Sequence, residues 1–224
     1  ALAARDPYNR LYARQTPVRL DAEFVRDVAL AAAGVLSPTV GGPSVYPYEP
    51  RGYLAPLTVP RREWSSDTGE SLYRRGLYTH WQRSFLHPSL IAFDAPTREE
   101  CTASRTVSNT PMQALVLLND PIFTEAARIF GERVLRHGGE TLEQRLSYAF
   151  RTALSREPTA EEVAVLRKLY HSQRARYSAD RNAAEKLISA GEWPVAKDLD
   201  TAELAAWSTL ARAILNLHET ITRG

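Results

Sequence analysis

The sequence predicts a mainly α-helical domain, a helical bundle crossed by one extended, proline-rich strap. Three observations predict it. Apolar residues recur at helical spacing through much of the chain, capping residues precede these stretches, and residues 37–69 contain six prolines. A chain of 224 residues can bury a substantial core, and we expect one helical domain over residues 1–224.

The first expected helix covers residues 21–36. Asp21 is placed to cap its N terminus by accepting hydrogen bonds from free backbone N–H groups. Phe24, Val25 and Val28 follow at helical spacing, so we expect them on one buried face.

The strap follows at residues 37–69, because a helix interior cannot accommodate so many prolines. Its apolar residues argue against a disordered linker and predict that it packs on the helices; they are Tyr46, Tyr48, Tyr53, Leu54, Leu57, Val59 and Trp64. Around residues 75–83, Leu77, Thr79 and Trp81 alternate with other side chains, which favours at most a short strand.

The remaining helices are predicted from their start and stop signals. Thr110–Pro111 and Asp120–Pro121 are each a cap followed by a proline at the first helical position, so two helices abut there. Capping boxes at Thr141/Gln144 and Thr159/Glu162 start two more, the second running to about residue 189. A last helix starts at Asp200.

The composition of the chain disfavours several classes of function. A net charge of +2 does not favour nucleic acid, and no apolar run is long enough to cross a membrane. With Cys101 as the only cysteine, the chain has no C-x-x-C-H haem-attachment motif, and we expect no cofactor within it. The five histidines include no pair at i and i+3 or i+4, so we predict no metal site.

Charged and polar residues are densest between residues 94 and 120. Asp94, Glu99 and Glu100 are candidates for acid/base chemistry or for Ca²⁺ ligation, although Asp94 equally suits a turn cap. The polar run over residues 104–110 suits either a bound sugar or anion, or the pinning of a loop to buried backbone groups.

Cys101 also has two interpretations. It is a nucleophile if Arg98 and Arg105 lower its pKa and if His80 or His87 reaches it as a base. A buried, inert thiol is the simpler interpretation.

Three stretches resemble the planctomycete cytochrome-c-associated PSD domain, the domain of unknown function 1553. They are residues 41–53 (GGPSVYPYEPRGY), residues 72–123, with FDAP, RE-CT and NTP-QAL-LLND in that order, and residues 211–221 (ARAILNLHETI). Eight positions match the family pattern and are our candidate site residues. They are Asp94, Arg98, Cys101 and Arg105 for catalysis, and Asn109, Gln113, Asn119 and Asp120 for binding. His80 stands where the family commonly has an aromatic residue.

The resemblance carries several expectations that composition does not. It implies an exported protein, periplasmic or at the cell surface, of which this chain is the C-terminal part, without the usual N-terminal portion. It implies partners within the same polypeptide, including that portion and a cytochrome c module bearing c-type haem, and a link to oxidation or binding of complex carbohydrate. The alternative is a non-catalytic module that docks neighbouring domains. Whether the domain is an enzyme stays open.

Overall fold

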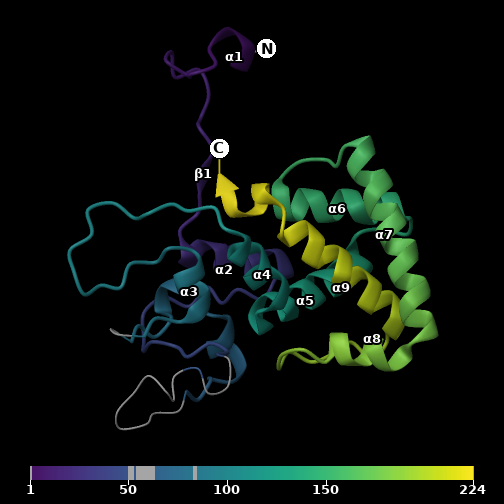
Figure 1. Ribbon diagram of the computed structural model, residues 1–224. Helices are drawn as coiled ribbons and strands as arrows, with labels where there is room; N and C mark the ends of the chain where they lie inside the picture. The colour runs from purple at the N-terminus through teal and green to yellow at the C-terminus, as the bar shows by residue number, and fades with distance from the viewer. Residues whose placement is uncertain (1, 50–52, 54–63, 83–84, 224) are drawn as a thin grey trace.

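A computed structural model describes residues 2–49, 53, 64–82 and 85–223, and the chain is mainly helical, as predicted (Figure 1). Its centre is the crossing of α5 (Pro121–His137) and α9 (Thr201–Leu215). A Cβ added at Gly131 of α5 would lie 2.9 Å from the backbone nitrogen of Ser208 in α9. The missing side chain therefore allows the two helices to approach closely, and Phe130 and Trp207 are fully buried beside the crossing.

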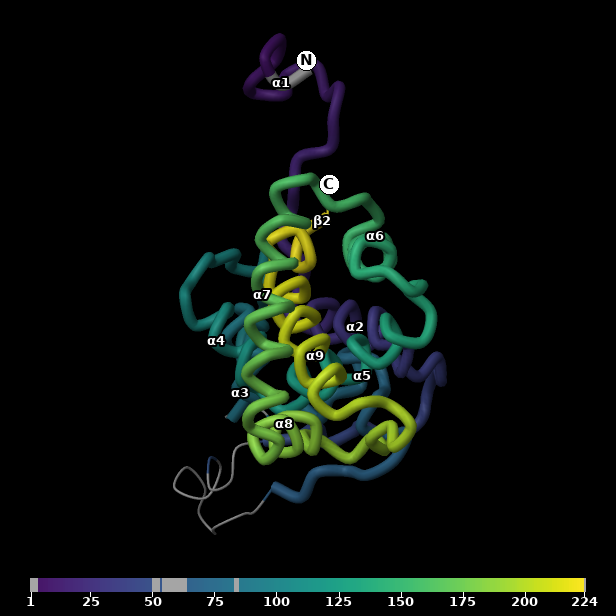
Figure 2. Tube along the Cα trace, turned by 90° about the vertical axis from the view of Figure 1, so that its right-hand side faces the viewer, coloured from purple at the N-terminus to yellow at the C-terminus, as the bar shows by residue number. Residues whose placement is uncertain are grey.

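Helices α6 (Leu142–Leu154), α7 (Ala160–Ala179) and α8 (Arg181–Ile188) cover one side of α9, and α7 runs along it in both views (Figures 1 and 2). Both predicted capping boxes, at Thr141 and at Thr159, are present. The prediction of one helix from residue 160 to 189 is wrong. α7 ends at Ala179, and the Asp180 side chain starts α8 by accepting a hydrogen bond from the backbone of Ala183 at 2.9 Å.

Helix α2 (Ala22–Ala33) is shorter than predicted because Gly34 ends it in the left-handed conformation, with φ of 84°. Asp21 is at the N-cap, but its side chain makes no cap hydrogen bond. The predicted buried face is also partly wrong, since Phe24 is 47% exposed. Arg26 and Asp27 are buried instead, because they bind the backbone of the segment that follows the strap.

That segment has 3₁₀ turns over Gly69–Tyr73 and Gly76–Tyr78, where a short strand was the most the sequence favoured. The Asp27 carboxylate accepts a hydrogen bond from Gly76 N at 2.6 Å. The extended parts of residues 37–49 form isolated bridges to this segment, Ser37 with Arg74 and Val45 with Thr79. The described part of the strap thus packs on the helical body as expected. Leu54, Leu57 and Val59 lie outside the described residues.

A two-stranded antiparallel ladder joins segments from near the two ends of the chain. It pairs β1 (Val18–Arg19) with β2 (Thr222–Arg223), and Arg19 is opposite Thr222. These short strands were not predicted. β2 follows the C-terminal 3₁₀ turn (His218–Ile221), whereas α1 (Leu2–Arg5) lies away from the helical body (Figure 1).

Two further helices flank the segment that carries most candidate site residues. α3 (Pro88–Ala92) precedes it, and α4 (Pro111–Asn119) follows it. Thr110 is at the N-cap of α4 as predicted, without a side-chain cap hydrogen bond. Among the described residues we find no helix with the length and hydropathy that a membrane span requires.

Candidate functional site

The candidate residues lie on the loop over residues 94–110, which we call the motif loop, on α4, and at Asp120 between α4 and α5. The loop leaves α3 through a left-handed residue, Asp94, with φ of 58°. Arg98, with φ of 63°, is a second. Each left-handed conformation costs a non-glycine residue on the order of 1 kcal/mol, so specific contacts must hold the loop in this path.

The first contact is a junction of Asp94, Arg19 and Ser108. Arg19 Nη2 lies 2.7 Å from Asp94 Oδ2, and its Nη1 donates to the Ser108 carbonyl at 2.7 Å. The Asp94 carboxylate also accepts hydrogen bonds from Ser108 N and from its hydroxyl, both at 2.8 Å. Burial alone would raise the pKa of Asp94, but these hydrogen bonds and Arg19 hold it below its ordinary value of 3.8. Asp94 is therefore an anionic structural group, and it joins both ends of the loop to β1.

Gln113 extends this junction into α4. Its side chain is 3% exposed, and its amide nitrogen donates to the Ser108 hydroxyl at 3.2 Å. Together with Asn109, Ser108 and Arg19 it lines a small cavity of about 230 Å³ beside β2. Two of the four predicted binding residues, Asn109 and Gln113, are therefore brought together.

The second contact joins the far side of the loop to the start of α2. Arg105 donates two hydrogen bonds to the Glu23 carboxylate, at 2.6 and 3.1 Å, and lies 3.6 Å from Asp21. These hydrogen bonds raise the pKa of Arg105. Burial works against ionisation of Glu23, but the hydrogen bond from Arg105 keeps the pKa of that carboxyl below 4.5. Like Asp94, Arg105 fastens the motif loop to the helical body.

Arg98 and Cys101 are apart from both contacts. The Arg98 guanidinium lies over the Trp81 ring, 3.7 Å from its centroid, and is exposed. Cys101 is exposed, so the expectation that this thiol is buried is wrong. Cys101 lies in the motif loop between the contact of Asp94 and the contact of Arg105.

His87 takes no part at the motif loop. Its imidazole is 2% exposed, and its two nitrogens contact the Tyr48 carbonyl at 2.6 Å and the Ser89 hydroxyl at 2.8 Å. Burial lowers its pKa from 6.5 to about 4. These contacts occupy both ring nitrogens, so this imidazole does not serve as a base for Cys101.

Asn119 and Asp120 stand where α4 passes into α5. Asn119 donates to the Leu115 carbonyl one turn earlier, at 2.9 Å. Asp120 caps α5, as predicted, by accepting a hydrogen bond from Ile122 N at 3.0 Å, and burial raises its pKa from 3.8 to about 6. Both residues make local helix-end contacts.

A buried polar network on α5 was missed. Glu125 and Arg128 are fully buried, and Glu125 accepts hydrogen bonds from the Tyr73 hydroxyl at 3.0 Å and from Trp193 N at 2.6 Å. One signal was available in the sequence. The two charged residues lie three positions apart among the small and aromatic side chains of the buried face of this helix.

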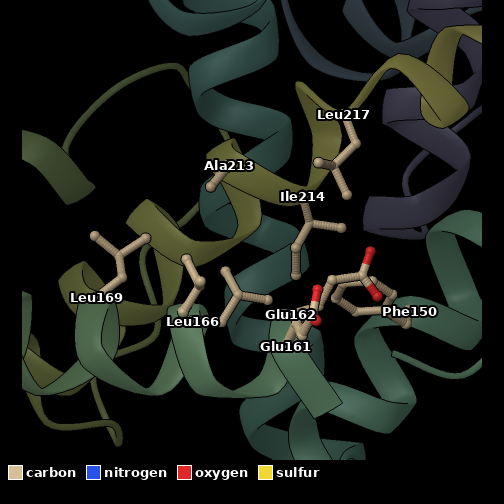
Figure 3. A pocket seen from close by; sticks show the side chains of 9 residues that line it. Phe150, Glu161, Glu162, Leu166, Leu169, Ala213, Ile214 and Leu217 are labelled. Atoms are coloured by element: carbon tan, nitrogen blue, oxygen red, sulfur yellow. The ribbon is translucent and has the colours of Figure 1, made fainter. Parts of the chain in front are cut away.

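Three further cavities formed by described residues are lined by none of the motif residues. The most apolar of those described, of about 410 Å³, lies between α6, α7 and α9 (Figure 3). Figure 3 shows the aliphatic side chains of Leu166, Ile214 and Leu217 facing it, with the carboxylates of Glu161 and Glu162 at one end. Among the described residues, no group of three His, Cys, Asp or Glu side chains is arranged to hold a metal ion.

These features define a helical domain in which the motif loop is held by ion pairs against the helical body. The chain belongs to the family described as PSD1, protein of unknown function (DUF1553), whose model matches residues 1–170. No curated protein and no solved structure matches the chain.

Proposed function

We propose that this domain is a non-catalytic structural module that docks neighbouring domains of the same polypeptide. One observation carries the proposal. The charged residues that anchor the motif loop are used by the fold itself, Asp94 with Arg19 and Ser108, and Arg105 with Glu23. A catalytic constellation needs its acids and bases directed at a place where substrate can bind. Here the anchoring groups meet one another instead.

The outward face of α4 supports a docking role. Met112 and Leu115 are 57% and 51% exposed, and Val107 of the motif loop is 63% exposed. Met112 and Leu115 lie three positions apart on α4 and therefore share one face of the helix, which favours contact with another protein surface. The motif loop and its ion pairs then serve to position α4 for that contact.

The family resemblance indicates which neighbouring domains this module docks. The docked partners are the N-terminal portion of the domain and a cytochrome c module of an exported, periplasmic or cell-surface polypeptide. Any c-type haem belongs to that module, and no step of chemistry is assigned to this chain.

Docking is tested by producing this chain and the other domains of its polypeptide as separate proteins and measuring their association by analytical ultracentrifugation. Leu115→Glu is expected to abolish the association and to leave the melting temperature unchanged, because the side chain is at the surface. Val165→Glu is the matched control, since Val165 is 66% exposed on the distant helix α7. Equal effects of the two substitutions, or no association of the unaltered chain, would refute docking through α4.

The cavity beside Asn109 and Gln113 favours a second candidate function, the binding of complex carbohydrate. Amide, hydroxyl and guanidinium groups line it, and these are the groups that bind sugar hydroxyls. Isothermal titration with oligosaccharides tests it. Binding that Asn109→Ala abolishes at unchanged melting temperature supports this function, and absence of binding refutes it.

A further inference from the structure

The segment over residues 191–194 is held to α5 through three of its backbone groups. Glu125 accepts the Trp193 N–H, while Arg128 donates to the carbonyl oxygens of Trp193 at 2.6 Å and of Pro194 at 3.4 Å. Gly191 is left-handed, with φ of 83°, and a Cβ added there would overlap the Glu125 carboxylate. The position of this loop is therefore fixed by Glu125 and Arg128, two charged side chains that are fully buried.

These hydrogen bonds fix the backbone of Trp193, whereas its side chain is 38% exposed. The ring stands edge-on to Tyr73, with centroids 5.2 Å apart and an interplanar angle of 86°. An exposed tryptophan on a rigid backbone loses little conformational freedom when a ligand binds, and such preorganisation favours affinity. A structural role would have been met by turning the indole into the core.

Trp193 stands between two cavities. One, of about 520 Å³, is lined by residues that include Pro38, Glu70, Tyr73, Glu192, Trp193 and Pro194; we call it the aromatic groove. The other, of about 360 Å³, shares Gly34, Val35 and Trp193 with it and continues along α5. Because the cavities are contiguous, they form a trough that suits an extended chain better than a compact molecule.

The charged residues that line the aromatic groove itself are acidic, whereas Arg133 and Arg136 line the neighbouring cavity. Glu70 and Glu192 are the charged lining residues of the groove, and no lysine or arginine of the described chain lines it. Hydrogen bonds from the Ser37 and Thr39 hydroxyls lower the pKa of Glu70, so this carboxylate is anionic at neutral pH. A cation is therefore favoured, both by the carboxylates and by the face of the indole.

We propose that the aromatic groove binds an extended peptide segment that contains proline and a basic residue. Prolines in a polyproline II segment pack on an exposed aromatic ring, here the indole of Trp193, with little loss of entropy, and a lysine or arginine reaches Glu70 and Glu192. The inference is independent of the proposed function, because none of the motif residues lines this groove.

The test is fluorescence anisotropy of the full chain with a labelled ten-residue peptide of paired prolines and single arginines. Two comparison peptides replace arginine by glutamate, or proline by glycine and serine. We expect the proline–arginine peptide to bind at least about tenfold more tightly than either, since each comparison removes one of the two recognition elements. Equal affinity for all three, or no binding of the first at about 1 mM, would overturn the proposal.

Substitutions inside and outside the aromatic groove show whether the peptide binds there. Trp193→Ala is expected to weaken binding by at least about tenfold, as for a central aromatic anchor. Glu192→Gln, at an exposed position, keeps the fold and is expected to weaken binding of the arginine peptide several-fold. Tyr12→Ala is the control, because Tyr12 is 89% exposed and lies in the N-terminal segment. Unchanged affinity in both groove variants contradicts the proposal even where the peptide binds.

Discussion

Arg105 and Glu23 are 82 positions apart in the chain, yet they share two hydrogen bonds. The pair joins the middle of the motif loop to the first turn of α2. Glu23 is largely buried and Arg105 is about one-third exposed, so part of the interaction is screened by solvent.

Replacing Arg105 by alanine leaves the Glu23 carboxylate buried without its partner. We expect the free energy of unfolding to fall by about 1–2 kcal/mol, measured by urea denaturation. Arg181→Ala is the control, because its pair with Glu185 on α8 is exposed and its loss is expected to have no measurable effect. Similar losses in both variants would show that the Arg105 pair does not anchor the loop.

Gly131→Ala tests the close crossing of α5 and α9. Alanine stabilises an exposed helix relative to glycine by about 1 kcal/mol, but here its Cβ would meet the backbone of α9. We expect a net loss of about 1–3 kcal/mol in thermal or chemical unfolding. An increase in stability would mean that the two helices separate without cost.

Asp120 makes stability depend on pH in an unusual direction. Burial raises its pKa to about 6 in the folded state, against 3.8 as the ordinary value. Between these values the folded state binds more protons than the unfolded state, so this group lowers stability as pH rises from about 4 to 6. Asp120→Asn keeps an N-cap without the charge, and is expected to remove a contribution on the order of 1–3 kcal/mol across that window. Identical pH profiles for the two proteins would contradict the shift.

His87 acts in the opposite sense. Its folded-state pKa of about 4 lies below the ordinary 6.5, so the unfolded state binds more protons between these values. The stability that neutral His87 contributes is complete above about pH 6.5 and is lost as the pH falls toward 4. Nuclear magnetic resonance titration is expected to show one imidazole, absent in His87→Asn, whose chemical shifts do not change above about pH 5.5. Titration of that imidazole near 6.5 would contradict its burial.

Cys101 is expected to react with a thiol-specific reagent in the native protein at a rate similar to that in denaturant, because its side chain is exposed. Cys101→Ser is expected to change the free energy of unfolding by less than about 0.5 kcal/mol. A thiol that reacts only after denaturation would show that the loop covers it.

The helices were the most predictable part of the fold because their signals are local. Thr141, Thr159, Asp120 and Asp200 cap the helices that the sequence assigned to them. The candidate site was less predictable. Its residues were named as a group from the family resemblance, but the partners Arg19 and Glu23 lie far away in the chain and carry no local signal.

The sequence by itself determined where most of the helices begin and where the proline-rich strap lies, since capping, proline geometry and periodicity act over a few residues. Only the tertiary structure decided that Asp94 pairs with Arg19 and that Cys101 is exposed. It also decided that Glu125 and Arg128 form hydrogen bonds with the backbone of Trp193. These outcomes depend on which distant segments pack together, and burial then determines whether each charged group is paired, shifted in pKa or left to solvent.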